Sequence, residues 1–134
     1  MKGKGQVALE YLFLTVMLLI IVGILFVYSL VIYNDNMNLS KAQNYVGQIA
    51  SAANQVSAWG PGTKVYVEAE LPAGVQSVKA QNKSITVRLQ VVGGISDIYA
   101  FTKAYITPVS LPATEGRKLL KVEMVDANIA VSTA

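Results

Sequence analysis

The first candidate for chemistry is Glu10, a carboxylate at the edge of a long uncharged segment. Residues 11–34 contain no Asp, Glu, Lys or Arg, and Lys2 and Lys4 precede them. A carboxylate costs roughly 2.5–3.5 kcal/mol at the centre of a bilayer and less near an interface. Because ionisable groups in such surroundings are usually paired, we expect Glu10 to take part in a charge interaction.

The residues needed for most catalytic sites are missing. The chain contains no histidine and no cysteine, which excludes the usual zinc sites and histidine-based acid–base catalysis. Glu68 and Glu70 stand two apart on an expected strand, so both face outward, and we expect them to be solvated. Gly93-Gly94 belongs to no phosphate-binding pattern. We therefore expect no enzyme activity, no catalytic residue, no cofactor and no metal.

Composition favours a membrane-anchored domain. The chain has 134 residues, of which 53% are hydrophobic, and a net charge of +3. That length suits one small domain plus a membrane segment. The basic residues form no cluster, so we expect no nucleic-acid partner.

One long helix must position Glu10. No proline interrupts the chain before Pro61, and we expect a helix over residues 6–59. Its first part, residues 6–33, is long enough to cross a bilayer, which takes roughly 20 residues. Since the lysines precede this part, we expect the N-terminus in the cytoplasm and the C-terminus outside.

The second part of this helix, residues 34–59, is amphipathic. Its apolar residues recur three and four apart, as on one face of a helix; they are Ala42, Tyr45, Val46, Ile49, Ala53 and Val56. A small β-region is marginally stable alone, so we expect this stripe to pack on the β-region. Gly60-Pro61-Gly62 should end the helix.

Residues 60–134 predict a β-strand head domain of about six antiparallel strands. Residues 64–71 alternate apolar and polar side chains. Residues 95–107 are apolar on both faces, as in a central strand, and residues 118–132 form a final hairpin. The expected fold class is α+β, with a long N-terminal hydrophobic helix and a small antiparallel sheet or sandwich as the head.

A further hairpin is expected at Asn82-Lys83. If these two residues form the turn, the four apolar side chains on either side share one face of the sheet; they are Val78, Ala80, Ile85 and Val87.

The N-terminal residues resemble the class III signal of archaeal type IV-like pilins. The likeness rests on Lys4-Gly5-Gln6-Val7-Ala8-Leu9-Glu10-Tyr11-Leu12. In that family a basic leader ending in glycine is cut before a glutamine, and a glutamate stands at the fifth mature position. The motif is confined to this stretch, while the layout of leader, long helix and β-domain extends over the whole chain.

The resemblance implies a role for each motif residue. Residues 1–5 would be a cleaved leader, with the scissile bond between Gly5 and Gln6. Gln6, Glu10 and Tyr11 would serve assembly. The new α-amine of Gln6 would pair with the Glu10 carboxylate, in the same or a neighbouring subunit, since each charge alone is costly in an apolar core.

The resemblance also implies partners and a location. A prepilin peptidase would process the precursor in the cytoplasmic membrane. A pilus assembly ATPase and a membrane platform protein would then drive polymerisation into an extracellular, homo-oligomeric helical filament, with adhesion as the expected role. The open alternative is a single-pass, membrane-anchored surface binding domain that does not polymerise.

Two N-glycosylation sequons are further candidate sites. They are Asn38-Leu39-Ser40 and Asn82-Lys83-Ser84. Asn82 is the better candidate because we expect it on a hairpin tip, whereas Asn38 lies close to the end of the apolar segment.

Overall fold

The computed structural model describes residues 2–134, so Met1 of the expected leader lies outside the described residues. Six elements follow one another along the chain: α1 (Lys2–Trp59), β1 (Lys64–Leu71), β2 (Val75–Val91), β3 (Gly94–Leu111), β4 (Gly116–Val125) and β5 (Asn128–Thr133). The chain divides into two compact units, one ending at Asn34 and the other running from Asp35 to Ala134. The head unit therefore includes the second part of α1.

The first unit is helical throughout its described residues. Its apolar side chains are exposed to solvent, with Leu9 67% and Phe13 65% exposed. By length and composition, α1 could cross a membrane. The helix begins at Lys2 and so takes in most of the expected leader, which sequence analysis had placed before it.

Glycine ends α1 where the sequence predicts. The amide of Gly60 donates to the Val56 carbonyl at 3.0 Å, and Gly60 has a φ of 98°. This left-handed conformation favours glycine and is a common way to end a helix. Pro61 follows, and a proline there cannot continue the helix.

The head contains one mixed sheet with the order β1-β4-β5-β3-β2. The pairs β1/β4, β4/β5 and β2/β3 are antiparallel, but β3 and β5 run parallel and pair at Ile106 and Ile129. The α+β class with a long N-terminal helix and a sheet head is thus confirmed. The expectation that every strand runs antiparallel is wrong for β3 and β5, and the head is a sheet, one of the two forms expected.

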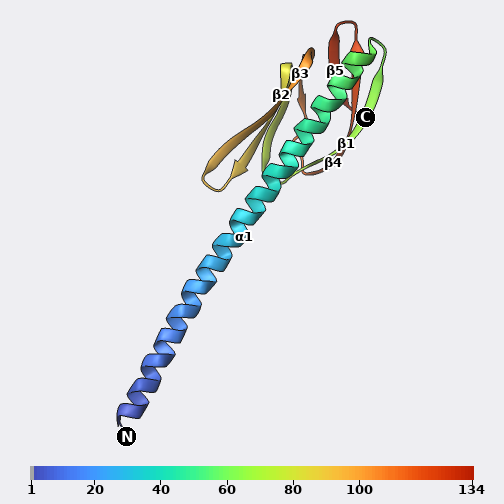
Figure 1. Cartoon of the computed structure of the whole chain (residues 1–134). Helices are drawn as coiled ribbons and strands as arrows, with labels where there is room; N and C mark the ends of the chain where they lie inside the picture. The colour runs from blue at the N-terminus through green and yellow to red at the C-terminus, as the bar shows by residue number, and fades with distance from the viewer. Residues whose placement is uncertain (1) are drawn as a thin grey trace. The chain divides into compact units, whose positions relative to one another are not determined.

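The second part of α1 replaces the second sheet of a sandwich. The predicted stripe is buried, with Ile49, Ala53 and Val56 fully inaccessible. It forms one apolar core with the inner face of the sheet, and Figure 1 shows the strands lying along this half of the helix. The sheet contributes Ala69, Leu71, Val78, Ala80, Ile85, Val87, Leu89, Ile98, Ile106, Leu111, Leu120, Val122, Ile129 and Val131. The prediction that the stripe packs on the β-region is confirmed.

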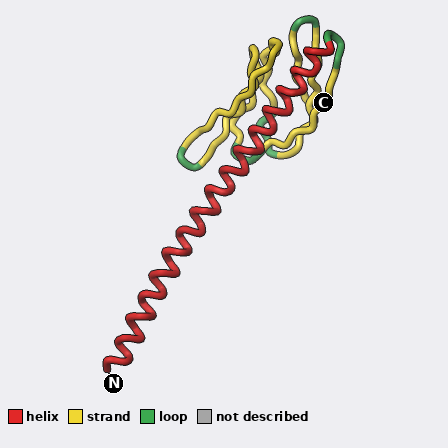
Figure 2. The backbone as a smooth tube through the Cα atoms, in the orientation of Figure 1, coloured by secondary structure: helices red, strands yellow, loops and turns green. Residues whose placement is uncertain are grey.

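The hairpin expected at Asn82-Lys83 lies within β2. The amide of Gln90 donates to the Gly74 carbonyl at 2.9 Å, so the two ends of β2 are side by side and the chain reverses between them. An unbroken strand of 17 residues, at roughly 3.3 Å per residue, would hold these ends far apart. Figure 2 shows the head strands, in yellow, doubling back on one another. Asn82 lies at the reversal and has a φ of 53°, as a two-residue hairpin turn requires. Ala80 and Ile85 face each other across this turn and both are buried, so the predicted hairpin is confirmed.

Candidate functional site

The motif residues at the N-terminus lie on one exposed helix. Gln6 and Glu10 are four residues apart and therefore on the same face of α1. Together with Leu9, Phe13 and Leu14 they line a shallow groove along that face. The Glu10 carboxylate thus lies among apolar side chains, with the backbone of Gln6 about one turn away.

The Gly5–Gln6 bond lies inside α1, near its first turn. A Cβ built on Gly5 would meet no atom within 4 Å, so a second molecule can approach the backbone there. Glycine is roughly 1 kcal/mol less favourable than alanine in a helix interior. Gly3 and Gly5 therefore lower the cost of unwinding this turn for a peptidase.

Tyr11 follows Glu10 and is 68% exposed. Its carbonyl accepts a hydrogen bond from the Thr15 hydroxyl at 2.8 Å. Threonine in a helix commonly bonds back to the carbonyl four residues earlier. The hydroxyl of Thr15 is thereby satisfied within the helix and costs little in apolar surroundings.

The two sequons lie in different settings. Asn82 is exposed and lies at the hairpin turn within β2, as the sequence predicts. The Ser84 hydroxyl of that sequon bonds to the Gln81 carbonyl at 3.4 Å. Asn38 is half-buried within α1, where the regular helix leaves its side chain less accessible than that of Asn82.

Glu68 and Glu70 are exposed, as a solvated face requires. Each makes an ion pair, Glu70 with Lys41 at 3.3 Å and Glu68 with Arg117 at 3.5 Å. These residues border an open cleft of about 340 Å³ between α1 and β1. Sequence patterns could not reveal these partners, because they come from distant segments of the chain.

Tyr45 also lines this cleft, and its ring is buried in the core. Its hydroxyl is buried and has no hydrogen-bond partner among residues 2–134. Burial raises the pKa of Tyr45 to about 12. The hydroxyl therefore stays protonated at neutral pH and carries an unpaired donor into the core.

Two polar side chains of α1 hold the sheet by its backbone. Asp35 Oδ2 accepts from the Val92 amide at 3.0 Å, and Asn54 Oδ1 accepts from the Lys103 amide at 2.9 Å. Val92 lies in the turn between β2 and β3. Sequence reasoning missed both contacts, because Asp35 and Asn54 look like ordinary surface residues of a helix.

Within residues 2–134, no group of three or more acidic side chains could hold a metal ion. Comparison of the chain with protein-family models, curated proteins and solved structures finds no match. The motif residues, the exposed helix and the head are therefore the features that bear on function.

Proposed function

We propose that the chain is the structural subunit of a type IV-like pilus. A prepilin peptidase cuts the Gly5–Gln6 bond at the cytoplasmic face, and the mature subunit waits in the membrane. An assembly ATPase and a membrane platform protein then move it into a surface filament, whose expected role is adhesion. The helix forms the filament core and the head forms the outer surface.

One observation carries the proposal: a helix with no charge over residues 11–34 and exposed apolar side chains throughout. So large an apolar surface must be covered by lipid or by other protein. Copies of the same helix can supply that cover in a filament, and lipid can supply it beforehand. The Lys4–Leu12 motif supports this order, in which the helix lies in lipid first and enters the filament after cleavage.

Glu10 distinguishes a filament subunit from a membrane-anchored binding domain. In the filament core its carboxylate pairs with the α-amine of Gln6, and removing one partner of a buried pair costs about 3–5 kcal/mol. Tyr11, exposed beside it, contributes packing between helices. A binding domain that stays in the bilayer has no comparable need for Glu10.

The test is Glu10→Gln in cells that carry a prepilin peptidase and the assembly proteins. We expect normal cleavage and insertion, loss of sheared filaments, and accumulation of processed subunit in the membrane. Glu115→Gln, which makes the same change at an exposed residue of the head, should leave filaments unchanged. N-terminal sequencing should find Gln6 first. Normal filament yield from Glu10→Gln would refute the pairing role, and chains that all begin at Met1 would refute the processing step.

The exposed sequon at Asn82 is part of the same proposal, as a glycosylation site on the outer surface of the filament. The half-buried Asn38 is the weaker acceptor. Mass spectrometry of purified subunits, with Asn82→Gln as the control, tests both sites.

A further inference from the structure

The turn between β2 and β3 is held at a defined level of α1. The amide of Val92 donates to Asp35 Oδ2 at 3.0 Å. Asp35 is the first charged residue after the uncharged residues 11–34. Because it is the backbone that donates, the turn itself, rather than one side chain, lies beside the residue where the chain leaves its uncharged segment.

This turn is apolar at its tip. Residues 89–96 carry no charge, and the side chains of Val92 and Ile95 are 67% and 56% exposed. Gly93 and Gly94 have φ values of 102° and 146°, which permit the tight reversal. The tip thus presents two aliphatic side chains that no described part of the chain covers.

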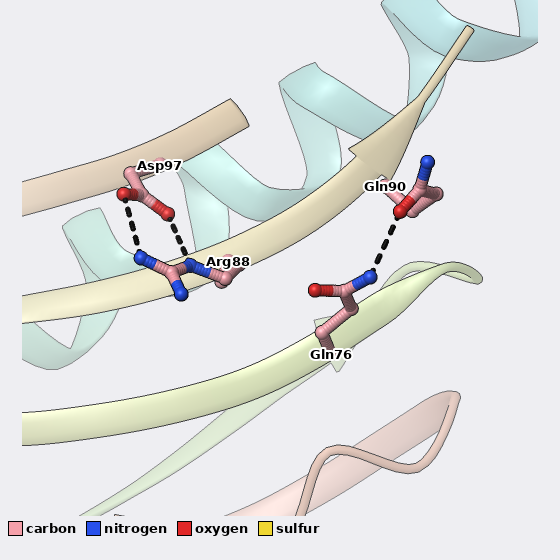
Figure 3. Close-up of polar contacts among 4 residues, drawn as sticks. All are labelled: Gln76, Arg88, Gln90 and Asp97. Carbon is pink, nitrogen blue, oxygen red and sulfur yellow. Dashed lines mark hydrogen bonds and ion pairs between the residues drawn. The ribbon is translucent and has the colours of Figure 1, made fainter. Parts of the chain in front are cut away.

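Polar contacts lie directly behind the tip. Arg88 donates to both carboxylate oxygens of Asp97, at 2.9 and 3.3 Å. Gln76 donates to the Gln90 side chain at 2.8 Å. Figure 3 shows Gln76 and Gln90 on the two adjacent arms of β2, and Arg88 of β2 beside Asp97 of β3. The hairpin is therefore apolar at its end and polar behind it, the same order of layers that a bilayer surface presents.

We infer that Val92 and Ile95 insert into the headgroup region of the bilayer that α1 spans before assembly, with the phospholipid surface as their partner. The inference rests on the membrane stage of the proposed function. Lipid is the expected partner because Asp35 holds the turn at the level of α1 where the uncharged segment ends. In an extended filament core, the same turn would no longer lie at a bilayer.

The chain contains no cysteine, so single-cysteine variants of the full chain can be labelled at one site. Val92→Cys reports on the tip and Phe26→Cys on the uncharged helix. Ala127→Cys is the matched control, on the exposed turn between β4 and β5. That turn follows Met124, whose amide donates a hydrogen bond to the Thr63 carbonyl just beyond the end of α1. The control therefore lies roughly 36 Å along the helix from Asp35, at 1.5 Å per residue.

Each variant carries an environment-sensitive fluorophore and is reconstituted in phosphatidylcholine–phosphatidylglycerol vesicles containing lipids spin-labelled near the headgroup. We expect quenching and a blue-shifted emission at Val92→Cys, with neither at Ala127→Cys. Adding Asp35→Ala should reduce the quenching at residue 92, whereas Asp35→Asn, which keeps an acceptor oxygen, should preserve it.

The Phe26→Cys variant separates the two proposals and is read with lipids spin-labelled along the acyl chain. If residue 26 is quenched and residue 92 is not, the inference is overturned while the membrane stage stands. If residue 26 is not quenched, the membrane stage fails and the inference fails with it. Blue-shifted emission at residue 92 that vanishes on dilution of the protein in lipid would show contact between copies, and would also overturn the inference.

Discussion

Replacing Tyr45 by phenylalanine should stabilise the head. The ring is 1% exposed, and its buried hydroxyl has no hydrogen-bond partner among the described residues. Phenylalanine keeps the ring and removes the unpaired donor. A buried unsatisfied polar group costs about 1–3 kcal/mol, so we expect a gain at the lower end of that range, about 1 kcal/mol, at neutral pH.

The assay is thermal unfolding of residues 35–134, followed by circular dichroism. For a unit of this size, about 1 kcal/mol raises Tm by roughly 4–8 °C. Tyr66→Phe, at a tyrosine that is 60% exposed, is the matched control and should leave Tm almost unchanged.

The pH dependence gives a second check on Tyr45. Its pKa in the folded protein is raised from 10.0 to about 12, so the folded state holds its proton more tightly than the unfolded state does. Stability from this difference is complete below pH 10 and is lost as pH rises toward 12. The advantage of Tyr45→Phe should therefore grow in that window. A variant less stable than the wild type at neutral pH would refute the reasoning, because the hydroxyl would then have a partner in solution.

The remaining predictions concern the helix and the sheet. Residues 60–134 without the helix should melt at a much lower temperature than residues 35–134, and equal melting temperatures would show that the apolar stripe packs elsewhere. Ile49→Ala, which empties a fully buried position, should cost about 2–5 kcal/mol in urea unfolding; a loss below 1 kcal/mol would contradict the packing. The hydrogen bond from Arg88 lowers the pKa of Asp97, so the stability that this pair adds above the unfolded-state pKa should fade as pH falls through the folded value. Asp97→Asn should flatten that acid dependence, and an unchanged profile would refute it.

Periodicity predicted the parts of the fold that depend on local pattern. The stripe from Ala42 to Val56 repeats at helical spacing, and burial of such a stripe is its only stable outcome. The final hairpin was also predicted correctly, since Val125 pairs with Asn128 across a two-residue turn.

The hairpin at Asn82-Lys83 was also predicted correctly from pattern, because the apolar residues on either side share one face when the turn falls there. The path of β3 could not be predicted in this way. β3 pairs with both arms of that hairpin, with Phe101 opposite Ser84 and Ile106 opposite Asn82. No local pattern contains that information.

The motif residues of the candidate site could be recognised from the sequence because they form one continuous stretch. The Asp35 contact was not, because it joins residues 57 positions apart. For the same reason, only the folded structure could reveal the ion pairs of Glu68 and Glu70 and the unpaired hydroxyl of Tyr45.

The contacts of Asp35 and Asn54 constrain the amino-acid sequence on the helix side but not on the sheet side. In each, the helix supplies a side chain and the sheet supplies only a main-chain amide. Every amino acid except proline has that amide, so residues 92 and 103 can change identity while both contacts persist. Diverging descendants could thus alter the tip of the hairpin freely while its attachment remains. Distant relatives that keep these contacts should therefore carry two short polar side chains on the helix, at the spacing of Asp35 and Asn54.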